Sequence, residues 1–163
     1  MSWHAEPART RRGVRRRAVL LAACGIAAGL GSTTTTAQAP GPARDVPASD
    51  RETIRRVIAR QIDAFRRDAA EEAFGFASPG IRALFGTADA FMTMVRTGYR
   101  PVHRPRSFAF DDLLDWGGTL VQPVRLVAPD GARVLALYDM ERQPDGSWKI
   151  AGCRLVEPPA GDV

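Results

Sequence analysis

The apolar residues between positions 50 and 98 recur every three or four residues, which is the period of an amphipathic helix. The first stripe comprises Ile54, Val57, Ile58, Ile62 and Phe65, and arginines occupy many of the positions between them. Ser49 and Glu52 have the spacing of a capping box, in which each side chain satisfies a free backbone N–H of the first turn. The pattern therefore predicts a first helix from Ser49 to about Asp68.

Shorter apolar patterns follow this helix. Residues 69–77 are predicted to form a second helix, and Ser78-Pro79 then restarts the chain, because serine caps a helix and proline suits its first position. A short apolar turn ends at Gly86. Thr87 is expected to cap a third helix that ends before Gly98.

After Pro105 the pattern changes to runs rich in β-branched and aromatic residues, near 107–115, 119–128, 132–142 and 147–156. Each separator contains a glycine, which tolerates a positive φ angle, so the runs indicate an antiparallel meander. Pro123 indicates an edge or a bulge in the second run, because proline has no N–H to donate. The expected fold class is α+β, with three N-terminal helices packed on a curved, cone-like, four-stranded antiparallel meander.

Residues 1–39 have the order of regions found in an export signal. Arg16-Arg17-Ala18-Val19-Leu20 resembles a twin-arginine signature, although the general export route stays open. The apolar run 18–30 is shorter than the roughly 20 residues that span a bilayer. Ala37-Gln38-Ala39 favours cleavage after Ala37 or Ala39, which would place the protein in the periplasm. The alternative is a lipoprotein anchored through Cys24.

The mature part is then a proline-rich linker, 40–48, followed by a single domain, 49–158. The chain has 23 basic and 18 acidic residues and a net charge of +5, but residues 1–39 contain six arginines and one glutamate. The remainder is therefore electrically balanced. This balance argues against nucleic-acid binding, and we expect contact with a membrane only during export.

Candidate chemistry is sparse in the mature part. It holds one cysteine, Cys153, and one histidine, His103, so a metal site built from these ligands is not expected. Phosphate-binding loops and serine-elbow motifs are missing from the sequence, and we expect no cofactor. Cys153 is interpreted as a buried small hydrophobe rather than a nucleophile.

Five segments, in order, resemble the family called domain of unknown function 4864, which contains small and often exported bacterial proteins. They are Gln61 to Phe65, Ala77 to Gly86, Phe91 to Val95, Tyr99 to Val102 and Asp145 to Cys153. The order of helices and strands also resembles the cone-shaped fold of nuclear transport factor 2 and its ketosteroid-isomerase and polyketide-cyclase relatives. The first resemblance implies no activity, and the second implies enzymes, carriers or interaction domains. A tyrosine is common in the family at the position of His103, which argues against catalysis by His103.

Two sets of residues are candidates for a binding site. The pocket candidates, which could line a cavity between helices and sheet or simply form the core, are Asp63, Phe91, Met94, Tyr99, Gln122, Tyr138 and Trp148. The anion-binding candidates, which could instead belong to a solvated connector balanced by Asp111, Asp112 and Asp115, are Arg96, Arg100, His103 and Arg104. Asp63 either points inward or pairs with a neighbouring arginine on the surface.

These features lead to the expectation of an exported, non-catalytic domain that binds a small apolar or anionic ligand or a protein partner in the cell envelope. A homodimer formed through the sheet is a related expectation. The alternative is a cone-fold enzyme of the isomerase, cyclase or dehydratase type, which performs acid–base chemistry on an apolar small molecule with Asp63 or Tyr138. An open cavity with a buried carboxylate would favour the enzyme.

Overall fold

The computed structural model describes residues 2–4 and 41–157. The paired arginines, Cys24 and both expected cleavage positions lie outside the described residues. Within these ranges, no helix combines the length and the apolar character needed to cross a bilayer. The described residues combine helices with an antiparallel sheet, so the α+β class is confirmed.

Within the described residues, five helices precede the long strands, where three were expected. They are α1 (Ala48–Arg66), α2 (Ala70–Gly75), α3 (Pro79–Phe85), α4 (Ala88–Gly98) and α5 (Arg100–His103). The Ser78 side chain accepts a hydrogen bond from the Ile81 N–H at 3.4 Å, and Thr87 accepts one from the Ala90 N–H at 3.2 Å. Both caps are where the sequence predicts them. The segment that starts at Pro79 is a helix rather than a turn.

The start of α1 differs from the expectation. The helix begins at Ala48, its N-cap is Pro47, and no side chain caps it. Ser49 lies inside the first turn, where its carbonyl accepts a hydrogen bond from the Thr53 hydroxyl at 2.8 Å. The predicted capping box therefore does not form, because the preceding prolines bring the chain into the helix earlier than Ser49.

The seven described strands form one sheet. They are β1 (Ser2–His4), β2 (Gly41–Pro42), β3 (Ser107–Phe110), β4 (Leu114–Trp116), β5 (Thr119–Val127), β6 (Arg133–Arg142) and β7 (Trp148–Val156). The order is β1-β7-β6-β5-β4-β2, and β3 also pairs with β5. The meander β5-β6-β7 agrees with the sequence pattern. The expected four-stranded sheet is thus extended by short strands at both edges.

The first predicted strand, 107–115, is split in two. Its first half, β3, pairs with the end of β5, and its second half, β4, pairs with the start of β5. Pro123 lies opposite the break, and its carbonyl accepts a hydrogen bond from the Asp111 N–H at 3.2 Å. Since proline cannot donate to a neighbouring strand, the pairing of β5 with β3 and β4 is interrupted at this point. The expected edge or bulge is not seen, because β5 is an interior strand and its register with β6 is continuous from Leu120 to Val127.

The expected linker is docked on the domain from Gly41 onward. β2 pairs with β4, and the Ala43 N–H donates to the Leu113 carbonyl at 2.9 Å. The Arg51 guanidinium of α1 donates to the carbonyls of Ala43, Arg44 and Val46. These bonds satisfy the carbonyls of a proline-rich segment that has few other partners.

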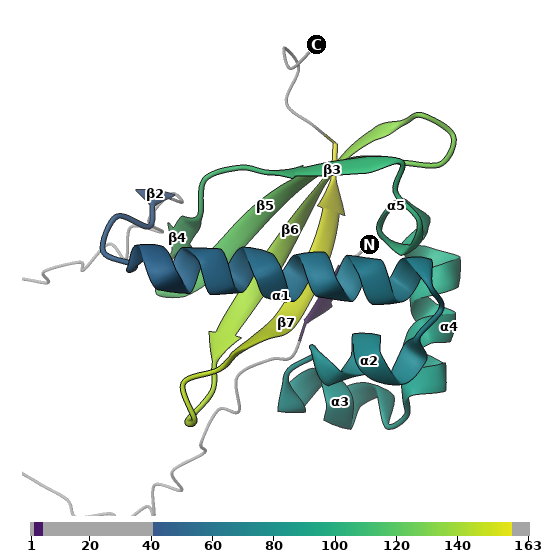
Figure 1. The fold of residues 1–163 in the computed structure, drawn as a ribbon, viewed down its shortest axis with the longest axis horizontal. Coiled ribbons are helices and arrows are strands. Elements are labelled where there is room, and N and C mark those ends of the chain that lie inside the picture. The colour runs from purple at the N-terminus through teal and green to yellow at the C-terminus, as the bar shows by residue number, and fades with distance from the viewer. Residues whose placement is uncertain (1, 5–40, 158–163) are drawn as a thin grey trace, which may run out of the picture. The chain divides into compact units, whose positions relative to one another are not determined.

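The core lies between the helices and one face of the sheet. α1 lies across that face, and α2, α3 and α4 gather beside β7 (Figure 1). The apolar stripe of α1 is buried at Ile54, Ile58, Ile62 and Phe65, whereas Val57 is only partly buried. From the sheet, Ala136, Tyr138 and Ile150 complete this core. Burial of these apolar side chains is the main force that holds α1 on the sheet.

Candidate functional site

The turn between α1 and α2 is held in an unusual backbone conformation at Asp68. Its φ angle is 54°, and among the described residues it is the only non-glycine with a positive φ. The Asp68 N–H donates to the Phe65 carbonyl at 3.0 Å, and the Ala69 N–H donates to the Ala64 carbonyl at 2.9 Å. Aspartate is among the few residues that tolerate this conformation. The turn directs the Asp68 carboxylate away from α1, towards α4 and α5.

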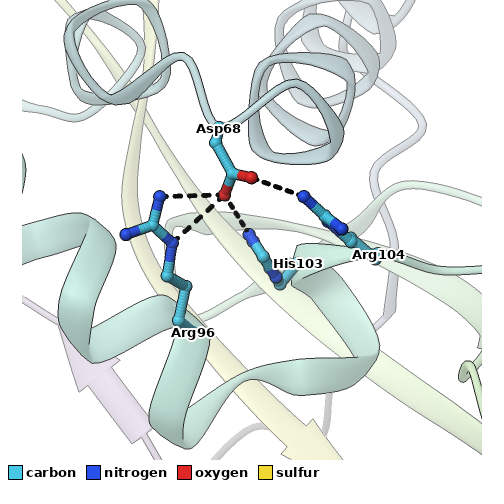
Figure 2. A network of polar contacts seen from close by, with 4 residues as sticks. All are labelled: Asp68, Arg96, His103 and Arg104. Atoms are coloured by element: carbon cyan, nitrogen blue, oxygen red, sulfur yellow. Dashed lines mark hydrogen bonds and ion pairs between the residues drawn. The ribbon is translucent and has the colours of Figure 1, made fainter.

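Three basic side chains converge on that carboxylate (Figure 2). The Arg96 guanidinium of α4 donates to Oδ1 through Nε at 3.1 Å and Nη2 at 3.0 Å. His103 Nε2 lies 2.8 Å from the same oxygen, and Arg104 Nη2 donates to Oδ2. We call Asp68, Arg96, His103 and Arg104 the Asp68 cluster. It joins the α1–α2 turn to the ends of α4 and α5.

The electrostatics of the cluster favour an ionised carboxylate. The hydrogen bond from His103, followed by that from Arg96, lowers the pKa of Asp68 to about 2. Opposite charges and donors at these distances stabilise the charged form of a carboxyl group. Two guanidinium groups facing one carboxylate also leave a net positive charge at this surface.

The local sequence explains how the basic residues reach Asp68. Tyr99 is buried, and Pro101 lies in the first turn of α5, so the chain reverses directly after α4. This short helix places His103 and Arg104 at its end. The Arg66 guanidinium donates to the Pro105 carbonyl at 2.9 Å, which ties the following connector to α1.

Three of the four predicted anion-binding residues therefore lie together, at Arg96, His103 and Arg104. Arg100 is exposed and is not among the partners of Asp68. The sequence indicated aspartates 111, 112 and 115 as the balancing charges, but the balancing carboxylate is Asp68. Asp111 instead pairs with Arg125 at 2.9 Å. Asp68 thus supplies an internal counter-charge to Arg96, His103 and Arg104.

The pocket candidates are mostly core residues. Phe91, Tyr99, Tyr138 and Trp148 are at most 8% exposed, and Met94 packs against the same cluster. Phe91 lies at the centre of an aromatic group: its ring centroid is 5.4–6.0 Å from those of Trp3, Phe65, Phe74 and Phe85. With Trp3 in place, these rings bury one another's surfaces.

Asp63 lies on the surface and pairs with a neighbouring arginine, which is one of the two alternatives that its sequence context allows. Its carboxylate accepts a hydrogen bond from Arg67 Nε at 3.0 Å, and its side chain is 62% exposed. Arg67 also pairs with Glu72 at 2.9 Å. A carboxylate in this position belongs to a solvated network on α1 and α2 and does not face the core.

Tyr138 and Cys153 lie opposite each other on β6 and β7, and both are buried. Burial raises the pKa of the Tyr138 hydroxyl well above its usual range, and the nearby Cys153 raises it further. Burial likewise raises the pKa of the Cys153 thiol. Both groups are therefore neutral at physiological pH, which is a poor state for a nucleophile or a general base.

Two buried glutamines make structural bonds. Gln122 Nε2 donates to the carbonyls of Asp111 at 2.8 Å and Pro123 at 2.9 Å, so it ties the segment between β3 and β4 to β5. Gln61 Nε2 donates to the Ala73 carbonyl at 3.1 Å and joins α1 to α2. Sequence reasoning selected Gln122 but missed Gln61 and Asp68. The signal for Gln61 was its place beside the apolar stripe of the first helix.

Comparisons with known proteins give a single result. No curated protein and no solved structure matches the chain. A family model does match residues 47–163, which include every described helix and the long strands β3 to β7. This span confirms the resemblance seen in the five sequence segments. The chain belongs to the family described as domain of unknown function (DUF4864).

Proposed function

We propose that this protein is an exported, non-catalytic binding domain of the cell envelope, whose partner is another polypeptide. The observation that carries the proposal is the burial of the core side chains between helices and sheet. Phe65, Tyr138 and Ile150 are each at most 1% exposed. A small-molecule site needs a concave, largely pre-formed space for its ligand, and these residues are packed against protein instead.

The charged groups support the same proposal. A cone-like domain that acts as an acid–base enzyme requires a carboxylate inside an apolar environment, which raises its pKa towards neutrality. Asp63 is exposed and paired with Arg67, and the pKa of Asp68 is lowered instead of raised. Neither group has the environment that this chemistry requires.

The export part of the proposal rests on residues 1–39, and it is tested by replacing Arg16 and Arg17 together with lysine. The expected result is that the wild-type protein occurs in the periplasmic fraction with an N-terminus after Ala37 or Ala39. The lysine variant should remain in the cytoplasm with its leader attached. Mass spectrometry identifies the N-terminal residue of the wild-type protein and of the lysine variant. An exported wild-type protein that starts at Met1 contradicts cleavage, and an exported, cleaved lysine variant contradicts the twin-arginine route.

One observation favours the enzyme as a second candidate. His103 Nε2 lies 2.8 Å from the Asp68 carboxylate, an arrangement that can orient an imidazole for proton transfer. The test is a thermal-shift screen of the protein against small carbonyl compounds and organic acids. A compound that stabilises the wild type but not the His103→Gln variant supports the enzyme. A screen in which no compound shifts either protein supports the binding domain.

A further inference from the structure

The outer edge of β7, on the side away from β6, is covered by two different segments. Near its start, the Ile150 N–H donates to the Phe76 carbonyl at 2.9 Å, and the Ile150 carbonyl accepts from the Ser78 N–H at 2.8 Å. Further along, β1 pairs antiparallel with Gly152–Arg154. An uncovered strand edge presents unpaired backbone groups that readily pair with another chain. The two covering segments come from different parts of the sequence. Each part of the β7 edge can therefore be uncovered without the other.

β1 also contributes a large side chain to the core. Trp3 lies opposite Cys153, and only 7% of its surface is exposed. Its ring makes edge-to-face contacts with Phe91, at a centroid distance of 5.6 Å, and with Tyr99, at 6.2 Å. Such contacts stabilise an aromatic pair beyond the effect of burial alone. A three-residue strand is thus held by backbone pairing on one side and by one tryptophan on the other.

This combination is how many domains bind an extended peptide. Main-chain hydrogen bonds to a free strand edge provide affinity. A pocket that accepts every second side chain of the peptide provides specificity. We call Gly152–Arg154 together with the rings of Phe91 and Tyr99 the Trp3 docking site. Removal of β1 would uncover both parts of it at once.

We propose that the Trp3 docking site binds an extended polypeptide segment with an aromatic side chain, and that Ser2–His4 occupies it within the same chain until the leader is cleaved. The release step rests on the proposed export, because cleavage after Ala37 or Ala39 removes β1 together with the leader. The docking itself does not depend on where the protein is located.

The structure also defines the chemistry of the partner. Phe76–Ser78 already covers the start of this edge, so the freed stretch pairs with a short segment, as β1 does. Its central residue meets two aromatic rings. Arg154, at one end of the site, donates to Asp139 at 3.2 Å. Because this charge already has a counter-charge, recognition depends on the aromatic ring and the backbone rather than on an acidic residue.

The test uses the full chain and a peptide of residues 1–6, Met-Ser-Trp-His-Ala-Glu. The Trp3→Ala variant should unfold roughly 10 °C below the wild type, as expected for loss of a buried aromatic side chain. Isothermal titration should show that the peptide binds Trp3→Ala with one-to-one stoichiometry and raises its unfolding temperature. The wild-type chain should not bind, because its site is already occupied. A peptide with alanine in place of tryptophan should bind neither protein.

Two further variants separate docking from a general loss of stability. Trp3→Phe keeps an aromatic ring in the site, so its unfolding temperature should stay close to that of the wild type. This variant should not bind the peptide. Trp116→Ala removes a tryptophan that is 45% exposed, and it should not bind the peptide either. If Trp3→Ala is unfolded, the peptide should restore its circular dichroism spectrum. A Trp3→Ala chain that is as stable as the wild type, or that neither binds nor responds to the peptide, overturns the proposal.

The release step has its own readout. Protein isolated from the periplasmic fraction should bind the peptide, whereas the purified full chain should not. A periplasmic protein that starts after Ala39 and yet fails to bind overturns the proposed site. A periplasmic protein that starts at Met1 overturns cleavage and therefore release, but the titration of Trp3→Ala still decides whether the site exists.

Discussion

The aromatic core around Phe91 and the Asp68 cluster both join helices that are distant in the sequence, but different forces hold them. In the core, rings from α1, α2, α3 and α4 bury one another, and no carboxylate takes part in these ring contacts. In the cluster, partly exposed side chains meet around one carboxylate. The apolar contacts of the aromatic core are therefore strong and insensitive to pH. The polar contacts of the Asp68 cluster are weaker, and their strength depends on protonation.

The largest expected effect belongs to the core. Phe91→Ala removes the ring that four other aromatic side chains contact, and it should lower the free energy of unfolding by about 3–5 kcal/mol. Urea denaturation at neutral pH measures the change. The matched control is Leu84→Ala in α3. Because Leu84 is 61% exposed, this substitution should lower the free energy of unfolding only slightly. Equal losses for the two variants would contradict the assignment of Phe91 to the centre of the core.

A smaller effect is expected where the core contains a polar bridge. Gln122→Leu keeps the side-chain size but removes the hydrogen bonds from Gln122 to the carbonyls of Asp111 and Pro123. Each carbonyl loses one donor and keeps another, Arg55 Nη2 for Asp111 and the Asp111 N–H for Pro123, so the free energy of unfolding should fall by about 1 kcal/mol. Hydrogen exchange of the β3 and β4 amides should increase as well. Gln143→Leu, in the turn between β6 and β7, should change neither measurement.

The effect of Asp68→Asn is expected to be smaller again and to depend on pH. The pKa of Asp68 is lowered from 3.8 to about 2 in the folded protein, so the ionised carboxylate stabilises the fold above the higher value. This stabilisation is lost as the pH falls through about 2. The variant should therefore be less stable than the wild type at pH 7, and the difference should shrink between pH 4 and pH 2.

Thermal denaturation across that pH range tests the prediction, with Asp112→Asn as the control, because Asp112 is exposed. Asparagine also tolerates a positive φ angle, so the substitution changes the charge and not the turn. A difference between wild type and Asp68→Asn that stays constant with pH would show that the cluster does not stabilise the fold through its charge.

The smallest effect is expected for Asp63→Ala. Asp63 and Arg67 form an exposed ion pair one turn apart on α1, and Arg67 keeps its second partner, Glu72, when Asp63 is removed. Exposed pairs of this type contribute little to stability. Thermal denaturation should show no shift beyond experimental error, in 0.05 M or in 0.5 M salt. A clear loss of stability would mean that Asp63 has a role in the fold that its exposure does not suggest.

Local patterns in the sequence predicted much of the fold. The stripe of α1, the caps at Ser78 and Thr87, and the glycine turns between β5, β6 and β7 depend on residues that are close in the chain. The short strands β1 and β2 were not predicted, because a strand of two or three residues has no period of its own. Such strands exist only because a partner edge is available to them.

The candidate site was predicted in part, for the same reason. Arg96, His103 and Arg104 lie close in the sequence and were grouped by their charge. Asp68 lies much earlier in the chain, in the turn after α1. Only the packing of α4 beside the α1–α2 turn brings Asp68 to the basic residues. The pocket candidates were chosen as apolar or aromatic residues, and these types line a cavity or fill a core equally well. Their burial could be read only from the structure.

The sequence by itself determined the α+β class, the meander, the family and the contrast between the basic residues 1–39 and the electrically balanced remainder. These follow from composition, periodicity and motif order, which need no knowledge of distant contacts. The tertiary structure decided that the pocket candidates other than Asp63 are buried or packed against the core, that Asp68 is the counter-charge of the basic connector, and that Trp3 docks beside β7. Each of these depends on residues that meet across long stretches of chain, and burial and charge pairing act through space rather than along the sequence.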